Sequence, residues 1–372
     1  MKLNKKRENK YQELEEKIRN TPLIPYTGEV ANNNNIWIKN VSESAFGSHY
    51  DLPYLELFKH YETIGKIKPG NKVFESTSGS AGVSMVNIGK ELGYECNVAI
   101  PKGGEKAREK AIFESFDKNK KIIHYDPMSR EIPTLKDDTN HLILTPKNKY
   151  VNGFMDLIRP LLVKNRDVFF LNHSMGKTKE MVNEVTLKGF ENLAKESLRD
   201  LNTLGETIDY FVPAVGNGSS ILGPGRALSK ETKTIGFEPF QAALAYELIH
   251  PGKYEEQYGI KPGTLERSML PGMSFSIQGK HVPIPHITTA IDQGILEDVI
   301  LVSDWHTDAN YQAHTGKQIG SEIPRWHHEN YQGLGRSTRA GIAAAKKLSE
   351  NTQGKNILLL GYDKMERYDD QR

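Results

Sequence analysis

Short apolar runs alternate along the chain with longer segments in which apolar residues recur every third or fourth position. The first pattern predicts buried strands, and the second predicts amphipathic helices. Because the two patterns take turns, the chain is predicted to be an α/β protein with doubly wound, mostly parallel sheets. The first part is expected to hold helices at residues 7–19, 81–92 and 105–116 and strands at residues 35–41, 72–75, 96–101 and 121–125.

The same alternation returns in the second half, with strands expected at 210–215, 234–238 and 356–362 and helices at 219–228 and 336–348. Two segments interrupt the pattern. Residues 127–150 are polar and weakly periodic, and we interpret them as a surface excursion or a link between domains. Residues 241–286 carry many glycines and prolines, which indicates irregular structure over a cleft.

Length and charge narrow the class of protein. A chain of 372 residues is long enough for two domains, each with its own core. Charged residues make up 26% and hydrophobic ones 37%, which is typical of a globular protein in water. The formal net charge is only +2, from 49 basic and 47 acidic side chains, and it favours no nucleic-acid partner.

One cysteine, Cys96, allows neither an internal disulfide nor a cysteine metal cluster, and this fits a reducing compartment. No long apolar run predicts a membrane span, and no apolar leader is visible at the N-terminus. The cytoplasm is the expected location. His327 and His328 are adjacent and lack an H-x-x-x-H spacing, so no metal site is expected.

Two glycine-containing loops each join a predicted strand to a predicted helix. The amides of a first helical turn are unpaired and attract anions. In the first loop, glycine allows close approach and hydroxyls add donors, which suits a carboxylate; its residues are Thr77, Ser78, Gly79, Ser80 and Ala81. The second loop has successive amides that suit a phosphate dianion, and its residues are Gly216, Asn217, Gly218, Ser219 and Ser220.

The stretch FGSHYD at residues 46–51 resembles the G-S-x-K-D element of fold-type II pyridoxal phosphate (PLP) enzymes, the cysteine synthase and tryptophan synthase β family. The loop at 77–82 is similar to the T-S-G-N-T-G loop that holds the substrate carboxylate in that family. The loop at 216–220 resembles the family's phosphate cradle, G-T-G-G-T. Residues 358–368 resemble its closing strand and D-S-G-E-R-Y element, so that the resemblance covers most of the chain.

This resemblance implies two doubly wound α/β domains and a homodimer. It places residues 1–44 as a lead-in and first strand of the larger domain, residues 45–150 as a smaller, mobile domain, and residues 151–372 as the rest of the larger domain with the phosphate loop.

Three departures surround the position that the resemblance assigns to the cofactor ring. Tyr50 replaces the lysine that forms the Schiff base with the cofactor aldehyde, and a phenol cannot form an imine. Ser80 replaces an asparagine that contacts the phenolic oxygen, and Lys364 replaces the serine at the ring nitrogen. We therefore expect that PLP, if bound, is not held as an internal aldimine and that the ligand is otherwise an unknown phosphorylated compound.

Three functions are consistent with these residues. The first is a cysteine synthase-like protein with a degenerate cofactor site, which binds a phosphorylated or carboxylated small molecule, either without catalysis or with altered chemistry. Tyr50, Ser48 and His173 are the candidate catalytic residues of that altered chemistry. The second is an active PLP-dependent lyase or β-replacement enzyme acting on an amino acid such as O-activated serine. The third is a non-catalytic partner of an active paralogue.

Two further residues bear on these alternatives. His173 lies where the family often places a glutamine or asparagine over the substrate, and a titratable imidazole there is suited to act as acid or base. Lys39 is expected on the strand before the FGSHYD loop and is interpreted as facing elsewhere.

Overall fold

The chain divides into two compact units in a computed structural model. It describes residues 3–117, 119–129, 131–146, 150–176, 181–228, 230–266, 268–273, 276–277, 280–281, 284–329, 331 and 333–369. Unit 1 comprises Met1–Asn20, Glu43–His173 and Met365–Arg372, and unit 2 comprises Thr21–Ser42 and Ser174–Lys364. These ranges differ from the boundaries expected from the sequence at residues 1–20, 43–44, 151–173 and 365–372, which group with the smaller sheet.

Unit 1 is built on a parallel sheet with strand order β5-β6-β4-β3-β7. Its strands are β3 (Lys72–Ser76), β4 (Glu95–Pro101), β5 (Lys120–His124), β6 (Asn140–Thr145) and β7 (Val168–Phe170). Its helices are α1 (Lys5–Ile18), α2 (Asp51–Thr63), α3 (Ser80–Leu92), α4 (Lys106–Ser115) and α5 (Tyr150–Lys164).

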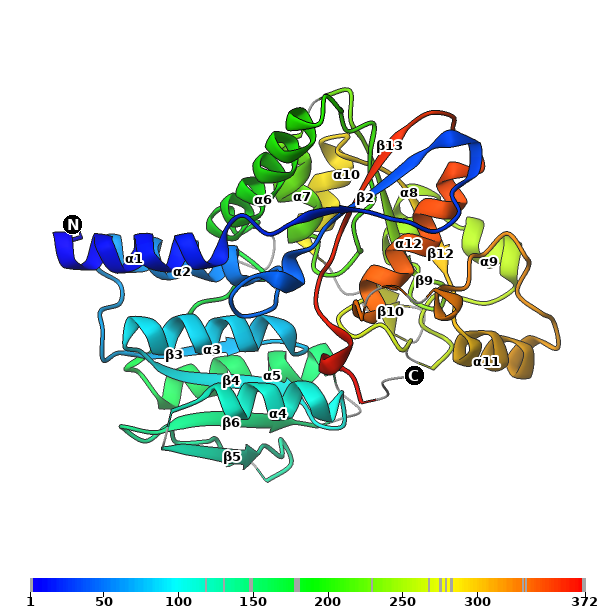
Figure 1. The fold of residues 1–372 in the computed structure, drawn as a ribbon. Coiled ribbons are helices and arrows are strands. Elements are labelled where there is room, and N and C mark those ends of the chain that lie inside the picture. Colours follow the sequence, from blue (N-terminus) through cyan, green and yellow to red (C-terminus); the bar gives the residue numbers. More distant parts are fainter. Residues whose placement is uncertain are drawn as a thin grey trace. The chain divides into compact units, whose positions relative to one another are not determined.

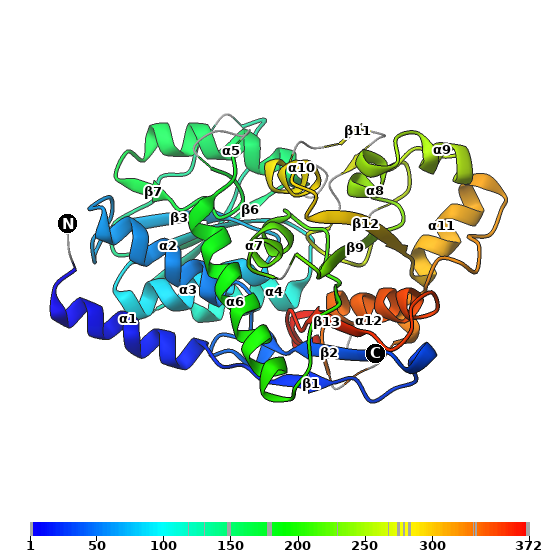
Figure 2. The same ribbon diagram turned by 90° about the horizontal axis from the view of Figure 1, so that it is seen from above.

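Helices cover both faces of this sheet. The crossovers through α3 and α4 run in one direction along the sheet and the crossover through α5 runs back, so right-handed connections place α5 on the opposite face. Figures 1 and 2 show this arrangement. Tight packing holds α3 to β4, since a Cβ added at Gly89 would lie 2.4 Å from the sulfur of Cys96. Cys96 is therefore a buried packing residue.

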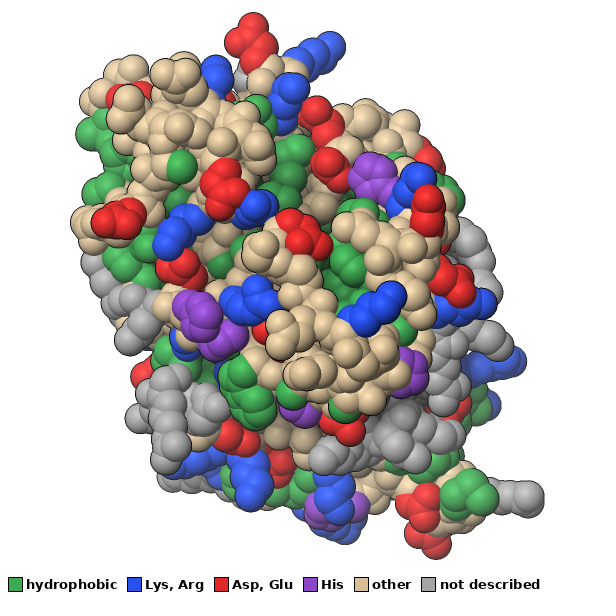
Figure 3. Space-filling view, turned by 90° about the vertical axis from the view of Figure 1, so that its right-hand side faces the viewer, with side chains coloured by type: hydrophobic (Ala, Val, Ile, Leu, Met, Phe, Trp, Pro, Cys, Tyr) green, Lys and Arg blue, Asp and Glu red, His purple; other side chains and the backbone are tan. Residues whose placement is uncertain are grey.

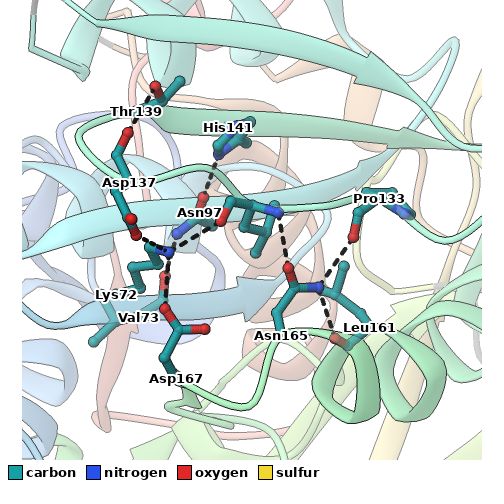
Figure 4. Close-up of polar contacts among 11 residues, drawn as sticks. Lys72, Val73, Asn97, Pro133, Asp137, Thr139, His141, Leu161, Asn165 and Asp167 are labelled. Carbon is teal, nitrogen blue, oxygen red and sulfur yellow. Dashed lines mark hydrogen bonds and ion pairs between the residues drawn. The ribbon is translucent and has the colours of Figure 1, made fainter.

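Polar side chains close the amino-terminal end of the unit 1 sheet (Figure 4). The Lys72 ammonium lies 2.8 Å from Asp167 and 2.5 Å from Asp137, and it donates to the Leu135 carbonyl. Asn97 on β4 bonds the imidazole of His141 at 2.7 Å, and burial lowers the pKa of His141 to about 4. Lys72 thus forms structural ion pairs at the first residue of β3. The glycine loop follows the opposite end of that strand.

The last described residues return to unit 1. Both carboxylate oxygens of Asp369 accept hydrogen bonds from backbone N–H groups at the start of α4, Lys106 at 2.9 Å and Ala107 at 2.8 Å. The guanidinium of Arg108 lies 4.7 Å from the ring centre of Tyr368. These contacts explain why a segment that follows unit 2 in sequence belongs to unit 1.

Unit 2 has a six-stranded sheet with order β1-β2-β13-β8-β9-β12, in which only β1 is antiparallel. Its strands are β1 (Leu23–Pro25), β2 (Asn35–Lys39), β8 (Tyr210–Phe211), β9 (Lys233–Pro239), β12 (Leu296–Val302) and β13 (Asn356–Leu360), with a separate hairpin of β10 (Ser276–Ile277) and β11 (Lys280–His281). Its helices are α6 (Glu184–Thr203), α7 (Ser219–Ala227), α8 (Leu244–Ile249), α9 (Lys253–Tyr258), α10 (Pro285–Asp292), α11 (Trp305–Thr315) and α12 (Arg336–Ser349).

The α/β class and the two mostly parallel sheets predicted from the sequence are confirmed. The interpretation of residues 127–150 as an excursion or link is wrong for part of that segment, because β6 pairs with both β4 and β5 inside the unit 1 sheet. Residues 241–286, expected to be irregular, contain the short helices α8 and α9. On the face shown in Figure 3, basic and acidic side chains are interspersed, in keeping with the small net charge.

Candidate functional site

Tyr50 immediately precedes α2, at its N-cap position, and is partly exposed. The loop that carries it is fixed by the buried carboxylate of Asp51, which accepts hydrogen bonds from the Ser44 hydroxyl at 2.6 Å and the Phe46 N–H at 3.0 Å. The Arg367 guanidinium donates to the Phe46 carbonyl at 3.2 Å. The backbone around residue 50 is therefore fixed by contacts with both Asp51 and Arg367.

Ser48 supports this loop. It is 1% exposed, and its hydroxyl oxygen accepts a hydrogen bond from the Tyr50 N–H at 3.2 Å. This contact fixes the backbone at Tyr50 just before α2. The structure thus gives Ser48, predicted as a catalytic residue, a positioning contact.

Asp51 makes the stability of unit 1 dependent on pH. Burial raises the pKa of Asp51 to about 6, against the opposing hydrogen bonds. The folded state then binds more protons than the unfolded state between about pH 4 and pH 6, so stability falls as pH rises through that window, by at most roughly 3 kcal/mol. Asp51→Asn keeps an acceptor for Phe46 and should flatten this segment of a plot of unfolding free energy against pH. An unchanged slope would contradict the assignment.

The predicted carboxylate loop, Thr77 to Ala81, follows β3 and runs into the first turn of α3. The Thr77 hydroxyl accepts a hydrogen bond from the Gly79 N–H at 3.1 Å. Gly79 has φ of 145°, and a Cβ there would lie 2.4 Å from Cδ of Arg108. Only glycine satisfies both constraints. Thr77, Ser80 and Ala81 are buried, whereas Ser78 is partly exposed.

His173 follows β7, the strand that pairs with β3, so it lies at the same sheet edge as the carboxylate loop. It is 3% exposed, and its backbone N–H donates to the carboxylate of Glu75 at 3.1 Å. Its ring and that of Tyr50 are edge to face with centroids 5.1 Å apart. Unit 1 therefore brings together Tyr50, His173 and the loop that begins at Thr77.

Glu75 and Tyr54 belong to this cluster and were not singled out in the sequence analysis. The Glu75 carboxylate lies 3.1 Å from Nδ1 of His173, and the Tyr54 hydroxyl lies 3.0 Å from the same nitrogen. Both side chains are buried. A signal for Glu75 exists in the sequence, because it is an acidic residue inside a strand that is otherwise apolar at its centre.

The predicted phosphate loop lies in unit 2, between β8 and α7. Gly218 is in the left-handed region, with φ of 83°, and begins the helix. The Asn217 side-chain oxygen accepts from the Ser219 N–H at 3.0 Å and from the Ser219 hydroxyl at 2.6 Å. Ser219 and Ser220 are buried in the first turn of α7. A glycine turn followed by a helix N-terminus is the geometry expected for a phosphate cradle.

His286 on α10 anchors this loop and was missed by sequence reasoning. Its Nε2 accepts a hydrogen bond from the Asn183 N–H at 3.0 Å, so in the neutral ring Nδ1 carries the proton. Nδ1 then donates to the Asn217 carbonyl at 3.2 Å. One buried imidazole thus connects the start of α6, the phosphate loop and α10.

Gly218→Ala tests the cradle. A Cβ at Gly218 would lie 2.8 Å from the backbone nitrogen of Ile287, in addition to the strain of a positive φ. We expect a cost of about 1–3 kcal/mol in unfolding free energy and at least about a tenfold loss of affinity for pyridoxal phosphate in equilibrium dialysis. Gly252→Ala is the control, because Gly252 also has positive φ but nothing lies within 4 Å of its Cβ. Equal binding by the two variants would contradict the assignment.

Lys364 follows β13, the neighbour of β8, so it lies at the same edge of the unit 2 sheet as the phosphate loop. One contact joins the ends of these strands, because the backbone N–H of Ala214 donates to the Tyr362 hydroxyl at 2.6 Å. Lys364 itself forms an antiparallel bridge with Leu334, which precedes α12. Lys364 is partly exposed.

Lys39 forms structural ion pairs with two carboxylates of α6. It is completely buried on β2, and its ammonium lies 2.7 Å from Asp200 and 3.6 Å from Glu196 on α6. It also donates to the Thr21 carbonyl at 2.6 Å. The Lys39 side chain is therefore engaged in packing β2 against α6.

Within the described ranges, no group of three or more histidine, cysteine, aspartate or glutamate residues is arranged to hold a metal ion. Over the same residues, no helix has the length and apolar content needed to cross a bilayer.

Comparison with known proteins defines the class. The family model described as pyridoxal-phosphate dependent enzyme matches residues 14–309, and the chain belongs to this family. The cysteine synthase of Staphylococcus aureus (strain N315) is 25% identical over 266 residues, which cover 67% of this chain and 72% of that protein. The cysteine synthase of Aquifex aeolicus (strain VF5) is 25% identical over 257 residues, covering 68% and 69%.

Solved structures show the same fold. A hydrogen sulfide-producing enzyme from Fusobacterium nucleatum has a TM-score of 0.68 and 19% identity, and the match covers 95% of this chain and 98% of that one. An O-acetylserine dependent cystathionine beta-synthase from Helicobacter pylori has a TM-score of 0.68 and 17% identity, with coverage of 96% and 97%. Identities this low bear on the fold alone.

Each unit by itself carries residues that bear on pyridoxal phosphate. The loop from Gly216 to Ser220 has the turn and the helix start that suit its phosphate. At the aldehyde end, position 50 carries a phenol in place of a primary amine. Lys39 and Lys72 are both engaged by carboxylates. The family's covalent attachment therefore has no counterpart at the position where the sequence resemblance places it.

Proposed function

We propose that this chain is a cysteine synthase-like protein that binds a small molecule bearing a phosphate or carboxylate and does not carry pyridoxal phosphate as an internal aldimine. The observation that carries the proposal is the identity of residue 50. Tyr50 lies on a well-fixed loop at the start of α2, beside the carboxylate loop and His173. A tyrosine in that place removes both the imine and the amine that would move protons.

The anion-binding parts of the site support a binding role. Both glycine loops have the strand-loop-helix form that presents amides to an anion. By the motif resemblance the ring contacts would also differ, because Ser80 of unit 1 and Lys364 of unit 2 stand where the family motifs have an asparagine and a serine. An ammonium at the ring nitrogen would disfavour protonation of that nitrogen and suit an anionic ligand instead.

Absorbance spectroscopy tests the proposal. Purified wild-type protein mixed with pyridoxal phosphate should show no stable yellow aldimine band, and borohydride treatment followed by mass spectrometry should attach no cofactor to the chain. A stable band that borohydride abolishes, with the cofactor fixed to a lysine, would overturn the proposal. Binding of the free phosphate compound is measured separately by dialysis.

A second function is favoured by the curated relatives, which are named cysteine synthase. It is a working PLP-dependent lyase or β-replacement reaction on an amino acid such as O-activated serine. Under this alternative, adding O-acetylserine and pyridoxal phosphate to the protein changes the visible spectrum and releases pyruvate or a new amino acid. The homodimer remains a prediction, which sedimentation of the purified protein tests. The absence of nucleic-acid and membrane partners is also still a prediction.

A further inference from the structure

A carboxylate and an imidazole are buried together beside Tyr50. Glu75 is 1% exposed and His173 is 3% exposed. One oxygen of Glu75 accepts from the Ser76 N–H at 2.8 Å, and the other accepts from the His173 N–H at 3.1 Å. Both oxygens of the Glu75 side chain are thus held by backbone donors.

The contacts determine which nitrogen of His173 carries the proton. The second oxygen of Glu75 lies 3.1 Å from Nδ1, and an ionised carboxylate only accepts hydrogen bonds. Nδ1 must therefore be protonated, and Nε2 of the neutral ring keeps its lone pair. The Tyr54 hydroxyl, 3.0 Å from the same Nδ1, cannot donate to a protonated nitrogen and donates to Glu75 instead. Burial, together with the charge of Glu75, raises the pKa of Tyr54, so Tyr54 stays neutral.

The Tyr50 ring contacts two imidazoles. It is edge to face with His173, with an interplanar angle of 82°, and its centroid is 4.2 Å from that of His49. Titratable groups in contact with His173 come from three elements: Glu75 from β3, Tyr54 from α2 and Tyr50 from the loop before α2. His49 contacts the Tyr50 ring. Among them, Tyr50 is the group that stands where the family motif has its amine.

We propose that Tyr50, His173 and Glu75 form a proton relay that replaces the missing amine. The O–H bond of Tyr50 breaks as its proton moves to Nε2 of His173, and the electron pair stays on the phenolate oxygen. The Glu75 carboxylate offsets the imidazolium charge, and the proton returns by the reverse step. Tyr50 meets the ligand, whereas Glu75 and Tyr54 are positioning residues. The catalytic meaning of this relay rests on the function proposed above, but its geometry is testable without a ligand.

Nitrogen NMR of protein labelled with ¹⁵N-histidine tests the relay, with the His173 signals assigned from His173→Gln. Neutral His173 should be the Nδ1–H tautomer. Tyr50→Phe should shift the Nε2 resonance and leave Nδ1 nearly unchanged. Tyr54→Phe is the matched control in the same cluster and should perturb Nδ1 rather than Nε2. Glu75→Gln should shift the Nδ1 resonance, because the Nδ1–H group loses its carboxylate acceptor.

Two results would overturn the relay. One is an Nε2–H tautomer in the wild-type protein, and the other is an Nε2 resonance that does not respond to Tyr50→Phe. Neither depends on Glu75→Gln folding, because both are read from the wild type and conservative tyrosine variants. An internal aldimine in the absorbance test would overturn the proposed function and leave the tautomer measurement standing, so the two failures are distinguishable.

Discussion

Replacing Tyr50 by lysine is expected to turn a colourless mixture of the protein and pyridoxal phosphate yellow. The loop from Ser44 to Asp51 is fixed by the Asp51 carboxylate and by Arg367, so the backbone at position 50 should survive the change. The partly exposed side chain can accommodate a lysine without burying its charge. Because only the unprotonated amine attacks an aldehyde, the band should form faster as pH rises toward the ordinary lysine pKa of about 10.4.

The Tyr50→Lys variant is expected to form close to one aldimine per chain, and the wild type is expected to form none. After borohydride, mass spectrometry should locate the reduced cofactor on the peptide that contains residue 50. Tyr50→Arg introduces a cation that cannot form an imine, and His49→Lys places an amine one residue away; neither should give the band. If Tyr50→Lys stays colourless while it still binds pyridoxal phosphate in dialysis, position 50 does not face the aldehyde.

Glu62→Ala should be the most destabilising single substitution among those considered for unit 1. The Glu62 carboxylate accepts from Arg7 at 2.6 and 2.8 Å and from the hydroxyls of Tyr11 and Tyr94 at 2.8 Å each. Although burial opposes its charge, these bonds lower the pKa of Glu62. Removing it leaves a partly buried guanidinium and two buried hydroxyls without their acceptor, at a cost of about 3–5 kcal/mol.

Urea unfolding followed by circular dichroism measures this loss, and hydrogen exchange of the α1 amides locates it. Glu13→Ala is the control, because Glu13 is 63% exposed and lies 4.0 Å from Lys10, a pair that contributes no more than a few tenths of a kcal/mol. The contribution of Glu62 should also fade as pH falls through its lowered pKa. A change below about 1 kcal/mol for Glu62→Ala would show that α1 is held by its apolar face instead.

Much of the fold follows from local pattern. Helices such as α3 and strands such as β4 have continuous apolar faces, and their predicted bounds agree with the structure within a residue or two. The strand β6 was missed because its apolar run is short and is surrounded by polar residues. In the sheet, β6 pairs with β5 on one side and with β4 on the other. Since β5 separates β4 from β6 in the sequence, this position between them cannot be seen in a local pattern. Sheet order is a property of long-range packing that no local window contains.

The candidate site was likewise predictable from the sequence only in part. A glycine between a strand and a helix is a local signal, and both loops were found from it. The partnership of Glu75 with His173 was not predictable, since it arises from the parallel pairing of β3 with β7, nearly a hundred residues apart in the chain. His286 was missed for the same reason. Its hydrogen-bond partners Asn183 and Asn217 precede α6 and α7 and are far from His286 in the sequence.

Unit 1 has a consequence for how the protein is made. Residues 365–369 cap α4 and support the loop that carries Tyr50, yet a ribosome translates them only after the whole of unit 2. A nascent chain can form the unit 1 sheet early, but its reactive loop stays unfinished until these late residues emerge. The loop that carries Tyr50 therefore gains its last support only when translation of the chain is nearly complete.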